Sequence, residues 1–243
     1  MEVCANSVSS ALAAQKGGAI RVELCSSLPE GGTTPSYGEI KLAKKMLDIA
    51  VFPIIRPRGG DFLYADLEFE LMKENIKLCK SLACEGVVTG ILTAGGKVDK
   101  IRCAELIELA GPMKVTFHRA FDMTIDLEEA LEDIIELGVA RILTSGGRAS
   151  AIAGAEIIAR LISLAAGRIV VMPGAGINPA NVRDLIRITG AREFHASARY
   201  PVPSKMLFRN ENLNMGDVTD EYSHSLTDVQ LVKNLLEQAN LAE

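Results

Sequence analysis

The chain contains two short segments, Glu2-Val3-Cys4 and Glu23-Leu24-Cys25, that repeat a carboxylate, an aliphatic residue and a thiol in the same order. Side chains alternate across a β-strand, so the Glu and the Cys of each segment share one face of a strand. If the two strands are neighbours, two thiols and two carboxylates meet at one place. A packed core does not require that arrangement, whereas a binding or catalytic pocket often does, so we expect a pocket here.

Histidine and arginine residues lie at the ends of other apolar segments that we expect to form strands. His118 and His195, two of the three histidines, both have inward parity, and histidine is the side chain best suited to proton transfer near neutral pH. The polar residues that we expect at this end of the fold are Glu2, Cys4, Glu23, Cys25, Arg56, Arg58, Asp61, His118, Arg119, Asp122, Glu193, His195 and Arg199.

Each of these residues also has an ordinary structural interpretation. A cysteine on a strand is usually a small core residue. His118 could be a satisfied core histidine, His195 could fix a loop, and Glu23 could form a structural ion pair with Arg56. Burying so many charges costs several kcal/mol for each unpaired ion. A chain that needed only stability would place aliphatic residues there. The joint occurrence of these polar and charged residues therefore favours a functional site.

Two glycine-containing segments predict an anion site at the same end of the fold. Thr144-Ser145-Gly146-Gly147 follows one expected strand, and Pro173-Gly174-Ala175-Gly176 follows the next and precedes a helix. Small residues let backbone N–H groups approach an anion, and a helix amino terminus adds a favourable dipole. Glycines are also ordinary turn residues, so both interpretations stay open. The anion-binding residues of this hypothesis are Ser145, Gly146, Gly174 and Gly176, together with Arg56, Arg58 and Arg119.

The elements that must position these residues alternate between strand and helix along the chain. Eight strand–helix alternations with short connections indicate a parallel sheet closed into a single-domain (β/α)8 TIM barrel, whose active site lies at the carboxyl ends of the strands. An open doubly wound sheet is the alternative, but the first turn, Ala5-Asn6-Ser7, lacks its glycine-rich fingerprint. The expected strands are 2–5, 21–25, 51–56, 86–89, 114–118, 141–144, 169–172 and 193–196. The expected helices are 7–16, 36–47, 66–82, 100–110, 126–137, 150–166 and 179–189.

The last part of the chain differs in composition. We expect a barrel core over residues 1–199 and a C-terminal extension over residues 200–243. Residues 200–224 are polar and turn-rich, with Pro201 and Pro203 near their start. Apolar residues then recur at helical spacing over residues 226–239, which predicts an amphipathic helix. This helix either completes the ring of barrel helices or packs on a partner subunit.

Composition narrows the class of protein. The chain has 243 residues, 48% of them hydrophobic, which is enough for a large core. The net charge of −5 and the scattered Lys and Arg argue against a nucleic-acid surface. No apolar run reaches the ~18 residues of a membrane span, and the start, Met1-Glu2-Val3, shows no secretory signal. The five cysteines are an odd number, so we expect free thiols and a cytoplasmic location.

Several longer motifs resemble those of the CutC family, which is named for copper homeostasis. The resemblance covers roughly residues 1–199. The matching segments are Glu2–Cys4, Glu23–Cys25, Glu30–Ser36, Ile55–Phe62, Thr116–Asp122, Leu143–Gly146, Met172–Gly174 and Glu193–Ser197. The resemblance implies a (β/α)8 barrel, a cytoplasmic location, a homodimer or homotetramer, and copper binding by Cys4 and Cys25.

The chemistry of Cu(I) agrees with that implied site. Cu(I) is soft and prefers thiolates, and adjacent strands lie ~4.8 Å apart, so two inward thiols could share one ion. Against this stand the cationic groups of Arg56, Arg58 and Arg119, which repel a metal ion and attract an anion. The first hypothesis, which rests on the two thiols, is a copper-binding homeostasis protein with Cu(I) as its ligand.

The second hypothesis is a barrel enzyme that acts on a small anionic metabolite, a phosphate or a carboxylate. The arginines would bind and orient the anion, since the guanidinium fork matches its oxygens. His118 or Glu23 would act as general acid or base, with Glu193 or His195 as the partner. A third, a non-catalytic scaffold, leaves the charged residues unexplained.

Overall fold

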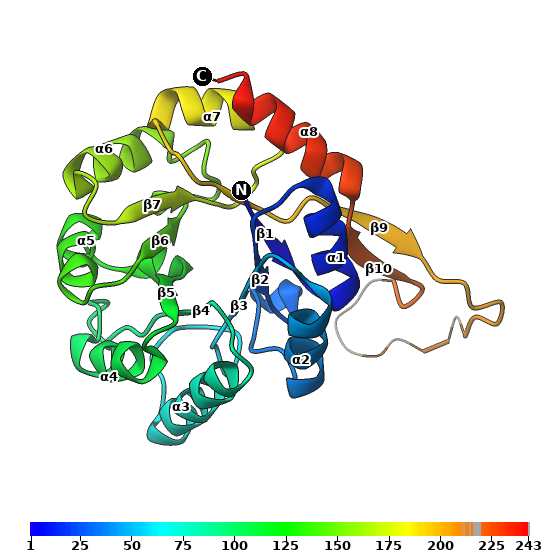
Figure 1. Cartoon of the computed structure of the whole chain (residues 1–243), viewed down its shortest axis with the longest axis horizontal. Helices are drawn as coiled ribbons and strands as arrows, with labels where there is room; N and C mark the ends of the chain where they lie inside the picture. The colour runs from blue at the N-terminus through cyan, green and yellow to red at the C-terminus, as the bar shows by residue number, and fades with distance from the viewer. Residues whose placement is uncertain (211, 214, 216–219, 243) are drawn as a thin grey trace.

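The fold is a closed ring of parallel strands inside a ring of helices (Figure 1). The structure, a computed structural model, describes residues 1–210, 212–213, 215 and 220–242. The strands are β1 (Glu2–Ala5), β2 (Arg21–Leu24), β3 (Ala50–Pro53), β4 (Gly86–Thr89), β5 (Lys114–Phe117), β6 (Arg141–Thr144), β7 (Val170–Pro173) and β8 (His195–Ala196). The helices are α1 (Val8–Gly17), α2 (Tyr37–Met46), α3 (Asp66–Ser81), α4 (Lys100–Ala110), α5 (Leu127–Glu136), α6 (Ala155–Ala165), α7 (Val182–Thr189) and α8 (Val229–Asn240). The expected (β/α)8 barrel is confirmed.

Two four-stranded parallel sheets make up the barrel, in the orders β3-β2-β1-β8 and β4-β5-β6-β7. They join between β3 and β4 through the bridge from Ile54 to Val88. On the other side, a Cβ added at Gly174, just after β7, would lie 3.4 Å from the Cβ of His195 in β8. The glycine therefore lets the two sheets approach closely and brings His195 toward the barrel interior.

Alternation along the strands divides the core into two parts. One face packs against the helices in the main hydrophobic core, with Val3, Ala5, Val22 and Leu24. The opposite face forms a smaller cluster with Cys4, Cys25, Phe52, Ile54 and Val88. The thiols of both repeated segments therefore face inward, as their parity predicts.

Local signals explain where several helices begin and end. Ser7 accepts the backbone N–H of Ser10 and caps the start of α1, and Gly18, with φ of 100°, caps its carboxyl end. Ser36 forms a reciprocal capping box with Glu39 at the start of α2. Helix α6 begins five residues later than expected, at Ala155, because residues 150–154 form turns that bring Gly154 against the carbonyl of Ser145.

The C-terminal segment completes the helical ring and adds a hairpin. Helix α8 contacts both α7 and α1 (Figure 1), and a Cβ at Gly17 would meet Val232 at 2.5 Å. The last predicted helix is thus the eighth barrel helix. The sequence predicts a polar, turn-rich segment over residues 200–224, and the structure adds a strand at each of its ends. Strands β9 (Arg199–Pro203) and β10 (Ser223–Thr227) pair antiparallel and extend from the barrel, while residues 211, 214 and 216–219 lie outside the described part.

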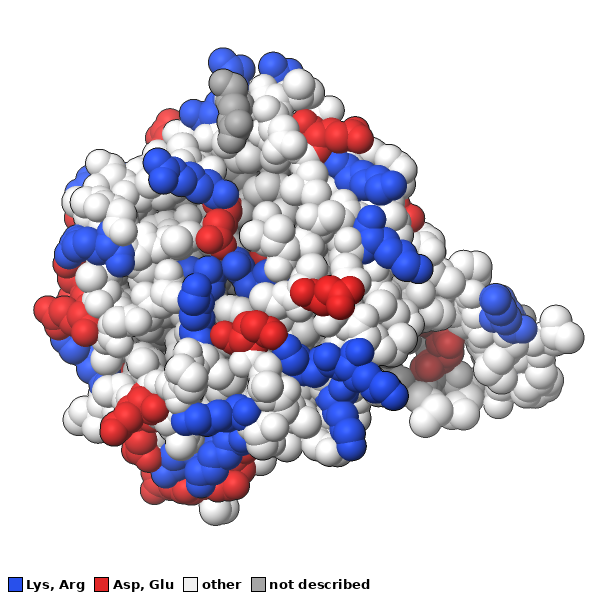
Figure 2. Space-filling model, viewed as in Figure 1, with Lys and Arg blue, Asp and Glu red and all other residues white. Residues whose placement is uncertain are grey.

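The surface agrees with the charge composition. Basic and acidic side chains are interspersed over the face shown in Figure 2, without one continuous basic area. Among the described residues, every helix is too short or too polar to cross a lipid bilayer.

Candidate functional site

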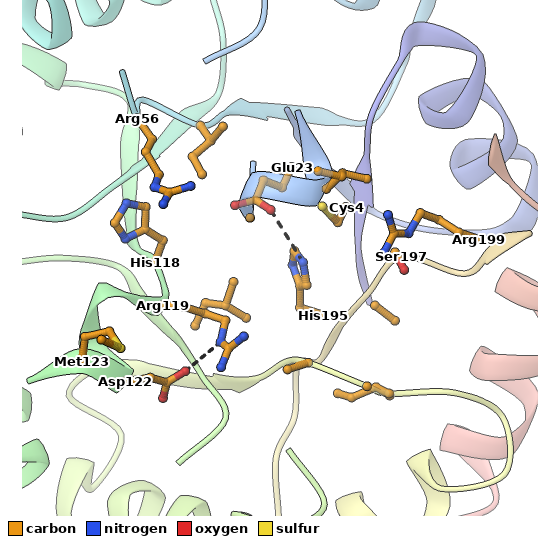
Figure 3. Close-up of a pocket in the computed structure, with 18 of the residues that line it drawn as sticks. Cys4, Glu23, Arg56, His118, Arg119, Asp122, Met123, His195, Ser197 and Arg199 are labelled. Carbon is orange, nitrogen blue, oxygen red and sulfur yellow. Dashed lines mark hydrogen bonds and ion pairs between the residues drawn. The ribbon is translucent and has the colours of Figure 1, made fainter. Parts of the chain in front are cut away.

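A cavity of about 490 Å³ opens at the carboxyl ends of the strands. Its walls come from β1, β2, β6 and β8 and from the segments that follow β2, β3, β5, β7 and β8 (Figure 3). This is the end of the fold at which (β/α)8 barrels place their active sites, and the volume suits a small molecule. The residues predicted for the site that line this cavity are Cys4, Glu23, Arg56, His118, Arg119, Asp122, Gly176, His195 and Arg199.

His195 is the centre of a buried polar cluster on one wall of the cavity. Its Nδ1 lies 2.7 Å from Oε1 of Glu2, and its Nε2 lies 3.6 Å from Oε2 of Glu23. Cys4, Glu23 and His195 each offer one potential ligand atom, and these three atoms lie within 4.8 Å of one another. Because Glu2 fixes Nδ1, the imidazole presents Nε2 to the cavity side of the cluster.

Burial and close contacts shift the pKa values in this cluster. Burial alone would raise the pKa of Glu2, yet the hydrogen bond from His195 and the charges of His195 and Arg21 hold it at about 2. Glu23 has fewer partners, and burial raises its pKa. Burial opposes protonation of His195, but its contacts with Cys4, Glu2 and Glu23 raise its pKa above the ordinary value. The site therefore holds one firmly ionised carboxylate beside an imidazole.

The thiols of Cys4 and Cys25 lie next to each other, with 3.5 Å between the two Sγ atoms. In the register of β1 and β2, Cys4 pairs with Glu23, so Cys25 lies two residues further along and its thiol approaches diagonally. Cys4 lines the cavity, whereas Cys25 is outside its lining and is 1% exposed. Contact with the Cys25 thiol, together with burial, raises the pKa of Cys4. The prediction that the two thiols converge is confirmed.

Glu2 and Glu193 were predicted at the carboxyl ends of the strands, and the structure places them elsewhere. Both lie at the amino ends of the strands, where Arg21 forms ion pairs with the two carboxylates and Arg141 lies 3.3 Å from Glu193. Glu193 is outside the lining of the cavity, and Glu2 reaches the site only through His195. The structure does not bring Glu193 to the position of a catalytic partner. Arg21 and Arg141 were missed, although Arg21 shares the strand parity of Glu23.

The arginines after β3 have separate positions. Arg56 is 4% exposed and lines the cavity, but its guanidinium donates to the backbone carbonyls of Glu30, Gly32 and Gly60. Arg56 therefore holds two loops in place. Its positive charge faces the cavity, but three hydrogen bonds of its guanidinium are already made to the backbone and are not available to a ligand. Arg58 is outside the cavity lining and pairs with Asp61 and Glu68. The structure does not bring Arg58 and Asp61 to the site.

The predicted anion loop after β6 already holds an anion from the chain itself. The carboxylate of Asp122 accepts hydrogen bonds from the backbone N–H groups of Ser145 and Gly147, and from the hydroxyls of Thr144 and Ser145. Arg119 also donates to it, at 2.8 Å. The Gly146 N–H donates to Thr144 instead. Ser145 and Gly146 are therefore not available to an external phosphate in this structure.

The two predicted glycines after β7 have different roles, one in packing and one in lining the cavity. Gly174 packs against Leu143 and His195, where a Cβ would lie 2.5 Å from Leu143. Gly176 lines the cavity together with Ser197, which follows β8. The backbone N–H groups of Gly176 and Ser197 form no hydrogen bond within the part of the chain that the structure describes. Ser197 was missed as a cavity residue, although it follows a strand and ends the Glu193–Ser197 motif.

His118 lies on the wall opposite the thiols, packed 4.9 Å from the ring of Phe62. Burial, and then the charge of Arg56, lower its pKa to about 3. Its Nδ1 accepts the backbone N–H of Ala120, so the proton of the neutral ring lies on Nε2. This Nε2 is buried and has no partner among the described residues. His118 is therefore a neutral donor rather than a base at neutral pH.

We expect replacement of His118 by Asn to weaken the pH dependence of stability. Asn keeps an acceptor for the Ala120 N–H but removes the titrating ring. The pKa of His118 falls from 6.5 to about 3 on folding, so below pH 6.5 the unfolded chain gains a proton that the folded chain does not. Between pH 7 and 5, urea unfolding should show wild type losing about 2 kcal/mol more than the variant. Equal losses would contradict a neutral His118.

The fold and site define a (β/α)8-barrel protein with a thiol, imidazole and carboxylate site at the carboxyl ends of its strands. The sequence profile of the CutC family matches residues 1–200. The chain is 52% identical over 243 residues to the family protein CutC of Chromobacterium violaceum, which covers 100% of this chain and 98% of the relative. The chain belongs to the CutC family, as its motifs indicate.

Two further comparisons agree. The copper homeostasis protein cutC homolog of Homo sapiens is 51% identical over 237 residues, covering 97% of this chain and 87% of that protein. A solved structure named as a copper homeostasis protein CutC, from Streptococcus agalactiae, superposes with a TM-score of 0.77 at 35% identity and covers 81% of this chain and 97% of its own. A phosphoribosylanthranilate isomerase from Thermotoga maritima, with a TM-score of 0.58 at 13% identity, shows the shared fold alone.

Proposed function

We propose that this chain is a copper homeostasis protein that binds Cu(I) through the thiols of Cys4 and Cys25, with Nε2 of His195 as a third donor. The observation that carries the proposal is the 3.5 Å separation of the two Sγ atoms beside an imidazole already oriented by Glu2. Thiolate and imidazole are ligands suited to Cu(I), and a histidine that binds a metal commonly donates its other ring N–H to a carboxylate, as His195 does to Glu2.

The names of relatives support a role in copper homeostasis. Proteins of Homo sapiens and Mus musculus, each 51% identical to this chain, are named copper homeostasis protein cutC homolog. A cytoplasmic location fits the proposal, because a reducing compartment keeps the free thiols available. The family resemblance also favours a homodimer or homotetramer.

The test is a titration of the reduced protein with Cu(I) against a competing chelator. Cys4→Ser and Cys25→Ser should each weaken Cu(I) binding by more than roughly 100-fold, the upper end of what changes in second-shell partners cost. The matched control is Cys79→Ser/Cys84→Ser, since these buried thiols also contact each other, and contact with Cys84 raises the pKa of Cys79. Loss of binding in this control, or unchanged binding in the first two variants, would contradict the site.

A second candidate function is catalysis on a small anionic metabolite. The observation in its favour is the buried pair of Glu23 and His195, which opens onto a cavity large enough for a small molecule and lined by Arg119. A thermal-shift screen with phosphorylated and carboxylated metabolites tests it. A stabilising compound whose effect is lost in Arg119→Gln would favour this function, and no response to any of them would count against it.

A further inference from the structure

Positive charge surrounds the path to the thiols. Three arginines line the cavity, Arg56, Arg119 and Arg199, against two acidic residues, Glu23 and Asp122. Asp122 is already the acceptor for four N–H and O–H groups besides Arg119. Glu23 lies beside the imidazole of His195. Because Arg119 and Asp122 form an ion pair, the charges that remain along the described lining are those of Arg56 and Arg199 against that of Glu23, and positive charge is in excess there.

Two of these arginines have no carboxylate partner within the described residues. The guanidinium of Arg56 is bound by backbone carbonyls alone, and its buried Nε has no acceptor there. Arg199 forms no ion pair in that part of the chain, and Figure 3 shows its guanidinium on the side of the cavity where Cys4 lies. Arg56 is buried, and a buried cation without a counter-ion is stabilised by an anion, whereas Arg199 is exposed and its guanidinium is accessible to a ligand in the cavity. The cavity therefore favours an anionic ligand and disfavours a free copper cation.

These observations conflict with a metal that enters alone, and they agree with a metal that enters already complexed. We propose that the cavity receives Cu(I) as the anionic complex of a small thiol that carries carboxylate groups, and that Arg199 recognises a carboxylate of this donor. The inference rests on the proposed Cu(I) function and names the chemical class of the partner that delivers the ion.

The surroundings of Arg199 suit a carboxylate. A guanidinium presents parallel N–H groups that match the two oxygens of a carboxylate. Ser197 and Gly176 line the same cavity and have backbone N–H groups without acceptors in the described chain. They follow β8 and β7, and barrels frequently bind anions at the loops of these last strands. Cys4 lines the same cavity, so a donor whose carboxylate is held there lies in the cavity that contains this thiol.

Transfer of the metal is a ligand exchange that leaves copper as Cu(I). Two Cu–S bonds to the donor thiolates break, while two Cu–S bonds to Cys4 and Cys25 and one Cu–N bond to Nε2 of His195 form. The proton that Nε2 of His195 carries before it binds copper passes to water. The protons lost by the two cysteine thiols pass to the two departing donor thiolates, which leave as thiols. Charge and electrons balance without an oxidant or a reductant, so the exchange needs nothing beyond the donor complex and the reduced protein.

The experiment compares donors of opposite charge. Reduced protein is mixed without oxygen with Cu(I) bound by glutathione, an anionic donor, or by cysteamine, a cationic donor, and uptake is followed by stopped-flow absorbance as donor concentration rises. Wild type should reach half-maximal rate at an about tenfold lower concentration of the glutathione complex. Arg199→Gln should raise that concentration about tenfold for the glutathione complex alone. Arg58→Gln is the matched control, because Arg58 lies outside the cavity.

Equilibrium Cu(I) affinity, measured against one competing chelator, separates the remaining outcomes. The proposal expects Arg199→Gln to leave this affinity unchanged. If the variant weakens it and slows both donors equally, Arg199 only offsets the negative charge of the copper–thiolate centre, and the inference is overturned. Indifference of wild type to donor charge overturns the inference alone. Failure to take up Cu(I) from either donor overturns the proposed function as well.

Discussion

Replacing Glu2 with Gln should lower the free energy of unfolding by about 3–5 kcal/mol, the usual cost of removing one partner from a buried ion pair. The Glu2 side chain is fully buried, and its two oxygens accept hydrogen bonds from Arg21 and His195. Gln has nearly the same size but only one oxygen, so its amide group must face one of these donors. Arg21 also loses half of its compensating charge, and Glu193 alone remains as its ion-pair partner. Urea unfolding at neutral pH measures the loss.

The same replacement has a second expected effect at the copper site. Glu2 holds the Nδ1 side of His195, so Gln should weaken Cu(I) binding by about 10- to 100-fold through the altered imidazole.

The control for the loss of stability is Glu74→Gln, which removes an exposed ion pair with Lys77 and should cost less than about 1 kcal/mol. A Glu2→Gln protein as stable as this control would show that the buried network contributes little to folding.

Replacing Asp122 with Asn should cost about 2–4 kcal/mol of stability, because bonds to a charged acceptor contribute about 1.5–3 kcal/mol each and the amide replaces one oxygen by a donor. The carboxylate joins the segment after β5 to the loop after β6 through Ser145 and Gly147. In the variant, the amide N–H₂ group opposes donors, and among the described residues the Thr144 hydroxyl and the Gly147 N–H have no other acceptor. Arg119 also loses its ion-pair partner.

Added phosphate distinguishes this account from a merely structural defect. If Asp122 occupies an anion site, phosphate should raise the melting temperature of Asp122→Asn more than that of wild type, since the loop N–H groups and Arg119 become available. The same phosphate concentration with Asp126→Asn is the control, because Asp126 caps α5 and also accepts backbone N–H groups. Equal shifts in all three proteins would mean that the loop has no particular affinity for anions.

The sequence predicts which side chains face the barrel interior, but it does not predict how far along the barrel axis each of them lies. Strand alternation correctly places Cys4, Cys25 and His195 on the inward face, because the period of two is a property of the backbone. Parity gives no height along the barrel axis. Glu2 pairs with His195 in the register of β1 and β8, so Glu193 lies two residues lower and meets Arg21 instead of the cavity.

Long-range pairing explains the other differences. Ser145 and Gly146 have the composition of an anion loop, but nothing local indicates that Asp122 fills it from the preceding strand–helix unit. Strand β9 contains Pro201 and Pro203, which lack the backbone donors of an ordinary strand, so its pairing with β10 is visible only in three dimensions. The barrel itself depends on repeated local signals and is therefore predictable.

X-ray absorption at the copper edge of the Cu(I)-loaded protein identifies the atoms that bind the ion. We expect two sulfur ligands and one nitrogen ligand in wild type, and loss of sulfur coordination in Cys4→Ser/Cys25→Ser. A first shell of nitrogen and oxygen alone, or a sulfur shell that persists in the double variant, would contradict a copper site at the thiols beside His195.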